Sequence, residues 1–230
     1  LNHSPSIVTD GLVLCLDAAN NRSYPKSGTV WADLAGNNNG TLENGPTFSG
    51  DNGGSLVFDG TDDYVELSSL STSLFSDGNA SLFCFLKSYT SSSNSSGDSG
   101  IFGFGSSGAN NHYTWTDGRA YIDTFRTSRV SAGSSIIGGS VDKGKPHAIC
   151  ITTKNGGNWN FYQIQNENLV LQYSTSAGTF GMSDSQKKIG YSNSSSYIFR
   201  GSFYNFLMYN KELSIGEIRQ NYEATAGRYI

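Results

Sequence analysis

The C-terminal segment, residues 200–230, constrains the fold more than any other part of the chain. Its first ten residues are rich in aromatic side chains, as a buried strand is, and good helix formers follow. Ser214 can accept the backbone N–H of Glu217, and Glu217 can reach back, so the pair predicts a capping box at the start of a helix. Gly227 is placed to end that helix. A strand that leads into one capped helix indicates a β-sandwich with a short C-terminal helix.

The composition favours an all-β chain. Glycine is abundant (28 residues) and aromatic residues reach 13%, whereas charged residues are only 15%. Many turn formers with many aromatics and few charges are typical of strands joined by turns. A length of 230 residues suffices for one β-sandwich, so we expect a single domain over residues 1–230.

Charge and hydropathy exclude two classes of partner. The net charge of −4 provides no basic surface for nucleic acid, so none is expected as a partner. No apolar run approaches the roughly 20 residues that a membrane-spanning helix needs, so we expect no membrane insertion.

Short apolar runs alternate with turn clusters along the whole chain, as in a sandwich or barrel. The segments 55–58 and 64–67 flank the turn at 59–63, and 81–89 is a long strand with apolar residues on both faces. Two meanders follow. The predicted strands are 11–17, 55–58, 64–67, 81–89, 101–104, 112–116, 119–125, 146–153, 159–165, 169–173, 187–191 and 201–209.

Five motifs in this order resemble the laminin-G-like branch of the concanavalin A-like superfamily. They are SLVFDGTDDYV at 55–65, KPHAICITT at 145–153, KIGY at 188–191, FRGSFYNFLMY at 199–209 and LSIGEI at 213–218. The resemblance covers roughly residues 8 to 226. It implies an antiparallel β-sandwich of jelly-roll type, a scaffold whose members mostly bind ligands and seldom catalyse reactions.

The N-terminal part resembles a narrower group, the laminin-G-like proteins that tailed phages encode. The similar segments are TDGLVLCLDAA at 9–19, WADLAG at 31–36 and NGTL at 39–42. This resemblance implies a virion structural, decoration or fibre protein on the virion surface. Its partners would be other virion proteins and cell-surface glycans, and a homo-oligomer is compatible with that role. The alternative is a carbohydrate-binding adhesion domain of a secreted bacterial protein.

The acidic residues do not form the pair that catalysis on this scaffold requires. Retaining glucanases need two carboxylates about 5 Å apart, which on a strand means positions i and i+2 or i+4. Asp123 has no such partner, and the adjacent Asp62 and Asp63 would face opposite sides of a strand. Gln163 and Gln165 only approximate the Gln-x-His motif of the superfamily's lyases. We therefore expect no enzyme, with a polysaccharide-degrading activity as the less favoured alternative.

Calcium is not expected, although the resemblance raises the question. Residues 81–116 resemble pentraxins, whose calcium-binding acid and amide fall here on Asn110 and Asn111, and whose second acidic cluster falls near 191–193. No carboxylate remains at either place, and hard cations prefer several oxygen ligands that include carboxylates. We therefore expect no metal and no cofactor.

A looser metal alternative is the acidic turn. Asp59, Asp62 and Asp63 could supply carboxylate ligands, but acids in such a turn commonly accept hydrogen bonds from its own backbone. We favour this capping interpretation.

The resemblance to pentraxins also places Cys84 and Cys150 at the two positions of their disulfide. If their strands are neighbours, both sulfur atoms can point the same way, and a bond requires Cα atoms about 4.4–6.8 Å apart. The alternative is two buried free thiols. We expect the strands to be adjacent and leave the bond open. Cys15 should be free.

A mixed polar and aromatic face is the predicted glycan site. Aromatic rings cover the C–H faces of sugars, and nearby polar groups bind their hydroxyls. Against this, aromatic residues at these positions could instead pack into the core of the sandwich. The candidate residues belong to two strands and the Asp-Gly turn between them: Tyr113, Trp115, Asp117, Arg119, Tyr121 and Asp123.

Overall fold

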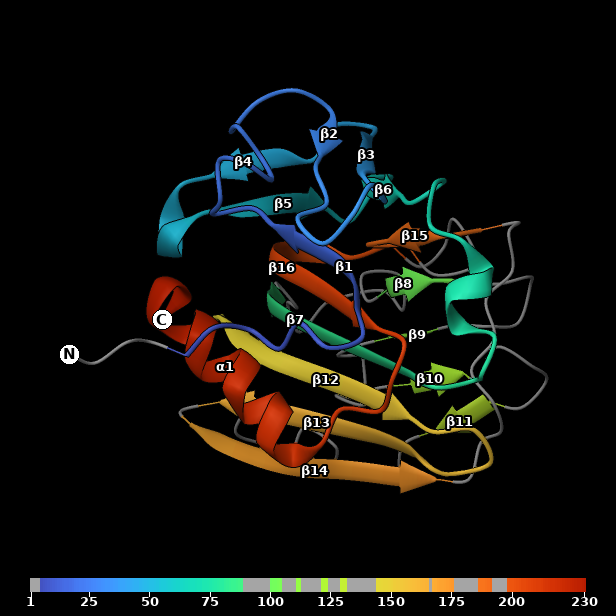
Figure 1. Cartoon of the computed structure of the whole chain (residues 1–230). Coiled ribbons are helices and arrows are strands. Elements are labelled where there is room, and N and C mark those ends of the chain that lie inside the picture. Colours follow the sequence, from blue (N-terminus) through green and yellow to red (C-terminus); the bar gives the residue numbers. More distant parts are fainter. Residues whose placement is uncertain are drawn as a thin grey trace.

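The computed structural model describes residues 5–88, 100–104, 111–112, 121–123, 129–131, 144–165, 167–175, 186–191 and 198–230. They form two antiparallel β-sheets and one α-helix (Figure 1). The expected class, an all-β jelly-roll sandwich with one C-terminal helix, is confirmed. Within the described residues, no helix combines the length and the apolar character that crossing a membrane requires.

The first sheet, sheet A, contains the long strands. In order across the sheet they are β14 (Asn168–Thr175), β13 (Trp159–Gln165), β12 (His147–Thr153), β7 (Ala80–Ser88), β16 (Arg200–Tyr209), β5 (Ser55–Asp59) and β4 (Thr47–Ser49). Strand β1 (Leu12–Asp17) also pairs with β16. The meander predicted over residues 146–173 is therefore confirmed as β12, β13 and β14.

The second sheet, sheet B, consists of shorter strands. Their order is β11 (Arg129–Ser131), β10 (Tyr121–Asp123), β9 (Asn111–His112), β8 (Gly100–Gly103), β15 (Lys188–Ile189), β6 (Tyr64–Glu66), β3 (Gly40–Glu43) and β2 (Val30–Trp31). Strands β5 and β6 belong to different sheets, so the turn at 59–63 connects the two layers. Two short 3-10 helices complete the described elements, η1 (Asp51–Gly53) and η2 (Thr72–Phe75).

Strand β16 lies in the centre of sheet A. Along one side it pairs with β7, and along the other it pairs first with β5 and then with β1. The register shifts between Phe203 and Asn205, which marks a bulge. There the Phe85 backbone N–H donates to Asn205 Oδ1 at 2.8 Å. The buried amide side chain thus accepts a hydrogen bond where the backbone ladder is interrupted.

Sheet A is buried on both faces. Leu82, Cys84 and Leu86 of β7 point into the core between the sheets, together with Trp31 and Trp159. Phe83 and Phe85 of the same strand point into a second core on the opposite face. The molecule therefore has three layers: sheet B, sheet A, and the helix with the N-terminal segment.

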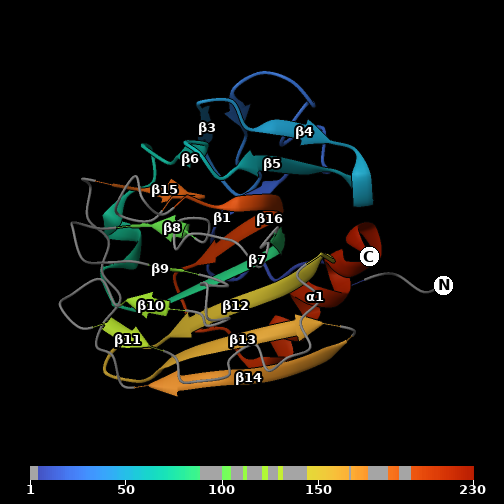
Figure 2. The ribbon, with the colours of Figure 1, turned by 180° about the vertical axis from the view of Figure 1, so that it is seen from behind.

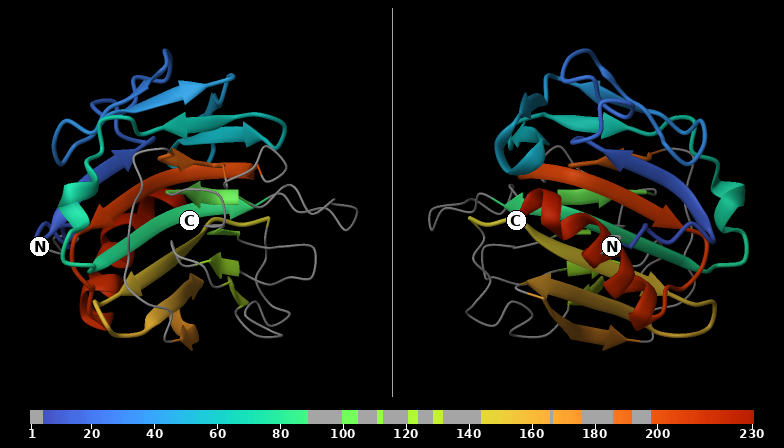
Figure 3. Two further views of the ribbon diagram at one scale, coloured as in Figure 1. Left: turned by 90° about the vertical axis from the view of Figure 1, so that its right-hand side faces the viewer. Right: turned by 60° about the vertical axis from the view of Figure 1, so that its left-hand side comes forward.

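Helix α1 (Ile215–Tyr229) covers the outer face of sheet A. Figures 1 and 2 show it in front of this sheet and behind it, respectively, and Figure 3 shows it crossing the strands. The Tyr222 ring stacks on Phe85 with ring centroids 5.4 Å apart. The helix continues past Gly227, so the predicted end there is wrong. The Tyr229 ring is buried with its centroid 5.2 Å from that of Phe85, and this packing stabilises the last helical turn.

Side-chain hydrogen bonds fix both ends of the helix. The predicted capping box between Ser214 and Glu217 is confirmed. At the other end, the buried Asp17 carboxylate accepts from Arg228 at 2.6 Å and from the Tyr229 hydroxyl at 3.0 Å. Such charge-assisted bonds are strong when they are shielded from water. They connect the last turn of the chain to its first strand.

The arrangement of the cysteines decides against a disulfide between Cys84 and Cys150. Strands β7 and β12 are neighbours, as expected, but Cys84 lies opposite Ile149, and Cys150 lies opposite Phe83. Because side chains alternate along a strand, this offset of one residue turns the two sulfur atoms to opposite faces of sheet A. Cys84 lies in the core between the sheets and Cys150 in the core under α1. A disulfide between them is therefore excluded, and Cys15, Cys84 and Cys150 are free thiols.

Burial makes these thiols unreactive in the folded protein. Removal from water raises the pKa of Cys15 to about 12, with the Asp17 charge as a further cause, and burial likewise raises the pKa of Cys84 and Cys150. We predict no alkylation by iodoacetamide at pH 8 in the native state, and three alkylated residues after unfolding without a reductant. Intact mass spectrometry measures both. If only one cysteine were alkylated after unfolding, and the untreated protein were two daltons lighter than the mass for three free thiols, a disulfide would be present. That result would contradict the register described above.

Candidate functional site

Four of the predicted glycan-binding residues, Tyr113, Trp115, Asp117 and Arg119, lie outside the described residues. Tyr121 and Asp123 begin and end β10, which pairs antiparallel with β9 and β11. The expected neighbouring strands are therefore present in sheet B. The glycan-facing role of these residues stays a prediction.

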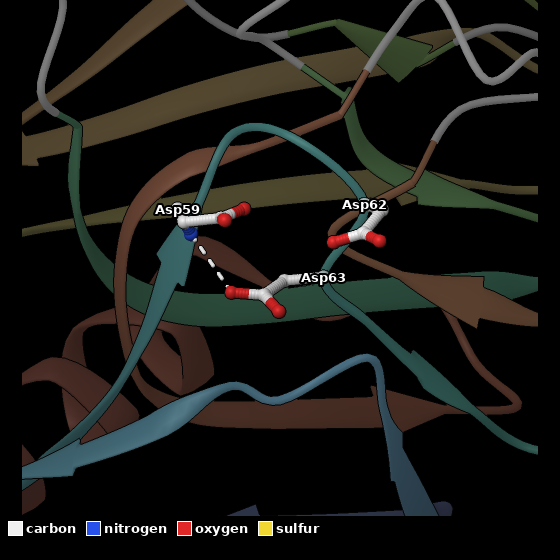
Figure 4. Close-up of side chains that lie close together, drawn as sticks. All are labelled: Asp59, Asp62 and Asp63. Carbon is white, nitrogen blue, oxygen red and sulfur yellow. Dashed lines mark hydrogen bonds between the residues drawn. The ribbon is translucent and has the colours of Figure 1, made fainter.

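The acidic turn between β5 and β6 brings three carboxylates together. One oxygen each from Asp59, Asp62 and Asp63 lies within 4.8 Å of the others (Figure 4). Asp62 and Asp63 would face opposite sides if they lay in a strand, but both lie in the turn that precedes β6. The turn curls back, and this places Asp59 beside both.

The turn uses two of these carboxylates for its own backbone. Asp59 Oδ1 accepts from the Thr61 N–H at 2.7 Å, and Asp63 Oδ2 accepts from the Asp59 N–H at 2.9 Å. Burial raises the pKa of Asp63, the nearby charges of Asp59 and Asp62 raise it further, and the Asp59 N–H opposes them. These bonds are the capping that the sequence suggests. Carboxylates are also ligands for hard cations, but these contacts are explained by the turn itself.

Directly after this turn, β6 presents a polar and aromatic surface on the outer face of sheet B. Val65 points into the core between the sheets, so its neighbours Tyr64 and Glu66 point outward. Lys188 of β15 lies opposite Glu66, and Glu43 of β3 lies opposite Tyr64. Three strands therefore contribute to one surface.

Lys188 connects the groups on this surface. Its ammonium nitrogen lies 3.8 Å from the centroid of the Tyr64 ring and 4.5 Å from that of the Tyr191 ring. The two rings meet edge to face with centroids 5.6 Å apart. Lys188 Nζ is 3.9 Å from Glu66 Oε2, and the two side chains are 21% and 29% exposed. We call Tyr64, Glu66, Lys188 and Tyr191 the outer-face cluster.

Gly190 is the reason that Tyr191 reaches the cluster. Ile189 points into the core, and strict alternation would turn Tyr191 inward as well. Gly190 adopts a φ of +79°, a conformation that glycine tolerates best, and this interrupts the alternation. A Cβ atom at Gly190 would lie 2.7 Å from Cε1 of Phe58. Both the backbone angle and the available space therefore require glycine here.

Most of the described charges around the cluster are negative. Burial raises the pKa of Glu66; the Lys188 ammonium opposes this shift and the Glu43 carboxylate adds to it. Burial, followed by the charges of Glu43 and Glu66, raises the pKa of Tyr64. The acidic turn adjoins Tyr64 in the chain. The surface thus offers hydroxyl, ammonium and carboxylate groups beside two half-buried rings.

The residues of this cluster lie in the motifs at 55–65 and 188–191, for which the sequence resemblance implies no binding role. Alternation around Val65 would have placed Tyr64 and Glu66 on one face. The contact with Tyr191 depends on the pairing of β15 with β6, which the sequence does not reveal.

A concavity lies where α1 crosses the hairpin of β13 and β14. Its volume is about 430 Å³, and Arg219, Glu223 and Glu167 contribute charged groups to its lining. The Tyr222 hydroxyl accepts the Glu167 N–H at 3.3 Å. The Tyr222 ring is buried and stacked on Phe85, so it offers no open face to a ligand. This concavity is therefore less suited to a sugar than the outer-face cluster.

No family model and no curated protein matches the chain. Solved structures do match its fold. Domain 4 of AbnA, an extracellular GH43 arabinanase from Geobacillus stearothermophilus solved in complex with arabinotriose, is 12% identical with a TM-score of 0.64, and the match covers 97% of this chain and 100% of that one. The Trypanosoma rangeli sialidase, solved with sialic acid, is 16% identical with a TM-score of 0.61 over 94% of this chain. The chain spans only about a third (33%) of that sialidase. At these identities the matches establish the fold alone.

We predict that Gly190→Ala disrupts the outer-face cluster. The substitution places a methyl group against Phe58 and forces alanine into a left-handed conformation, so stability should fall by about 2–4 kcal/mol. The matched control is Gly156→Ala, which has a similar φ of +69° but nothing within 4 Å of the added methyl group. Urea unfolding measures both variants. Equal losses would show that the contact with Phe58 has no effect.

Proposed function

We propose that this protein is a non-catalytic carbohydrate-binding domain that holds glycans on the outer face of sheet B. The observation that carries the proposal is the outer-face cluster. Sugars combine C–H faces with hydroxyl groups, and proteins bind them through aromatic rings beside hydrogen-bonding groups. Tyr64 and Tyr191 supply the rings, and Lys188 and Glu66 supply a donor and an acceptor on the same surface.

The match to the arabinanase domain supports this proposal. It extends over nearly the whole of both chains, and that domain was solved in complex with arabinotriose. It is thus a complete domain of the same fold that holds a carbohydrate. The match to sialidase, which covers only a third of that protein, supports a glycan-related role less directly.

The use of the acidic turn favours binding over catalysis. Its carboxylates are as close together as the roughly 5 Å that retaining glycosidases require. However, Asp59 and Asp63 hold the turn through hydrogen bonds to its backbone. A nucleophile and a general acid must instead be free to face a substrate. We therefore propose that these residues shape the edge of a binding surface.

We predict that Tyr64→Ala and Tyr191→Ala each weaken glycan binding roughly fivefold, because each removes ring contact worth about 1 kcal/mol. The measurement is a glycan array, followed by calorimetry with the best ligand. The control is Ile215→Ala, which truncates an exposed residue on α1. Trp115→Ala and Tyr121→Ala test, in the same assay, the glycan site that the sequence predicts.

Two results would contradict this assignment. If the tyrosine variants fold and bind every glycan like the wild type, the outer-face cluster is not the site. Release of sugars from the bound glycans by the wild type, with loss of release in Asp62→Asn, would instead show an enzyme.

The finer role as a laminin-G-like virion protein of a tailed phage rests on the sequence resemblance alone. We propose it as the setting for glycan binding, with other virion proteins as partners and the virion surface as the location. A secreted bacterial adhesion domain is the alternative. The prediction is co-purification with phage particles through density-gradient centrifugation, read by mass spectrometry. If the protein were found only in secreted bacterial fractions, the alternative would be supported.

A further inference from the structure

We propose that the outer-face cluster selects uncharged glycans and discriminates against acidic ones such as uronates and sialylated sugars. This inference rests on the proposed function, because it names the ligand class of the same surface. It follows from the charges around Lys188, the one cation among the four residues of the cluster.

The ammonium of Lys188 is already engaged. It lies over both tyrosine rings, at 3.8 Å and 4.5 Å from their centroids, and 3.9 Å from the Glu66 carboxylate. An acidic sugar would have to compete with these partners for the ammonium. A sugar hydroxyl makes no such demand, because it can accept from Lys188 and donate to Glu66 while the ammonium keeps its place.

Among the residues that the structure describes, carboxylates outnumber cations around the cluster. Glu43 lies opposite Tyr64, and its charge acts on both Tyr64 and Glu66. Asp59, Asp62 and Asp63 form the turn that leads into Tyr64. The described cations that oppose these charges, besides Lys188, are Arg200, whose side chain covers the Gly60 position of the turn, and Lys187, whose charge acts on Glu66. An anionic ligand would therefore enter a field of its own sign.

Such repulsion acts mainly on charged ligands and weakens with salt. Surface charges interact over about 10 Å at 0.1 M salt and over about 3 Å at 1 M. Discrimination by charge should thus be strongest at low salt, whereas binding of a neutral sugar should barely change. This difference separates an electrostatic filter from a pocket that rejects acidic sugars by shape.

The test uses matched pairs of ligands that share a skeleton: lactose with 3′-sialyllactose, and galactotriose with trigalacturonate. Affinities of the wild type are measured by calorimetry at 20 mM and 500 mM NaCl. We expect the neutral member of a pair to bind at least tenfold more tightly at low salt, and the gap to narrow at high salt.

Two isosteric variants, Glu43→Gln and Asp62→Asn, remove one charge each beside the cluster. We expect each to strengthen binding of the acidic member about threefold at low salt, with the neutral member unchanged. Asp10→Asn is the matched control, because it removes the same charge from an exposed residue that pairs with Lys211 at the start of α1. It should change neither affinity.

The possible outcomes separate the two proposals. If acidic members bind as tightly as neutral ones, and Tyr64→Ala still weakens both, the selectivity is wrong and the site is right. If the neutral preference persists in Tyr64→Ala with unchanged affinity, the preference belongs to another surface and the proposed site is wrong. A preference that is indifferent to salt and to Glu43→Gln would overturn the electrostatic filter.

Discussion

Burial of sheet A on both faces is the constraint on which the rest of the structure depends. A strand with apolar side chains on alternate sides, such as β7, needs a cover on each side. Sheet B supplies one cover, and α1 with the N-terminal segment supplies the other. The aromatic residues of α1, its capping box and the bonds from Asp17 to its last turn all serve this second cover. The helix is therefore part of the core.

The connection between the layers sets the position of the candidate site. Strand β5 ends in sheet A and β6 begins in sheet B, so the chain between them must turn sharply at the edge of the sandwich. Asp59 and Asp63 stabilise that turn by accepting backbone N–H groups. The same turn delivers Tyr64 to the outer face, where Gly190 delivers Tyr191 from the neighbouring strand. The surface thus depends on two local backbone conformations, the turn at 59–63 and the left-handed Gly190.

The sequence predicted the pattern within strands better than the relations between them. The faces of β7, the C-terminal helix and its capping box follow from local periodicity and chemistry. The disulfide alternative failed because the register of β7 against β12 is set by packing, and one residue of offset reverses a face. The grouping of Asp59, Asp62 and Asp63 was visible in the sequence, because all three belong to one short turn. Tyr64 and Tyr191 could not be joined without knowing that β6 pairs with β15.

The location of α1 makes the two outer sides of the molecule different, because the helix covers sheet A and leaves the outer face of sheet B uncovered by it. The described chain begins along this helix, where Gln220 Nε2 donates to the Ser6 carbonyl at 2.8 Å, and it ends with the helix itself. Both ends therefore lie on the side of sheet A that faces away from sheet B (Figure 3). Anything joined to either end, whether a tag, a solid support or another polypeptide, would leave the outer face of sheet B pointing outward. The fold is thus suited to presenting that face at a distance from its point of attachment.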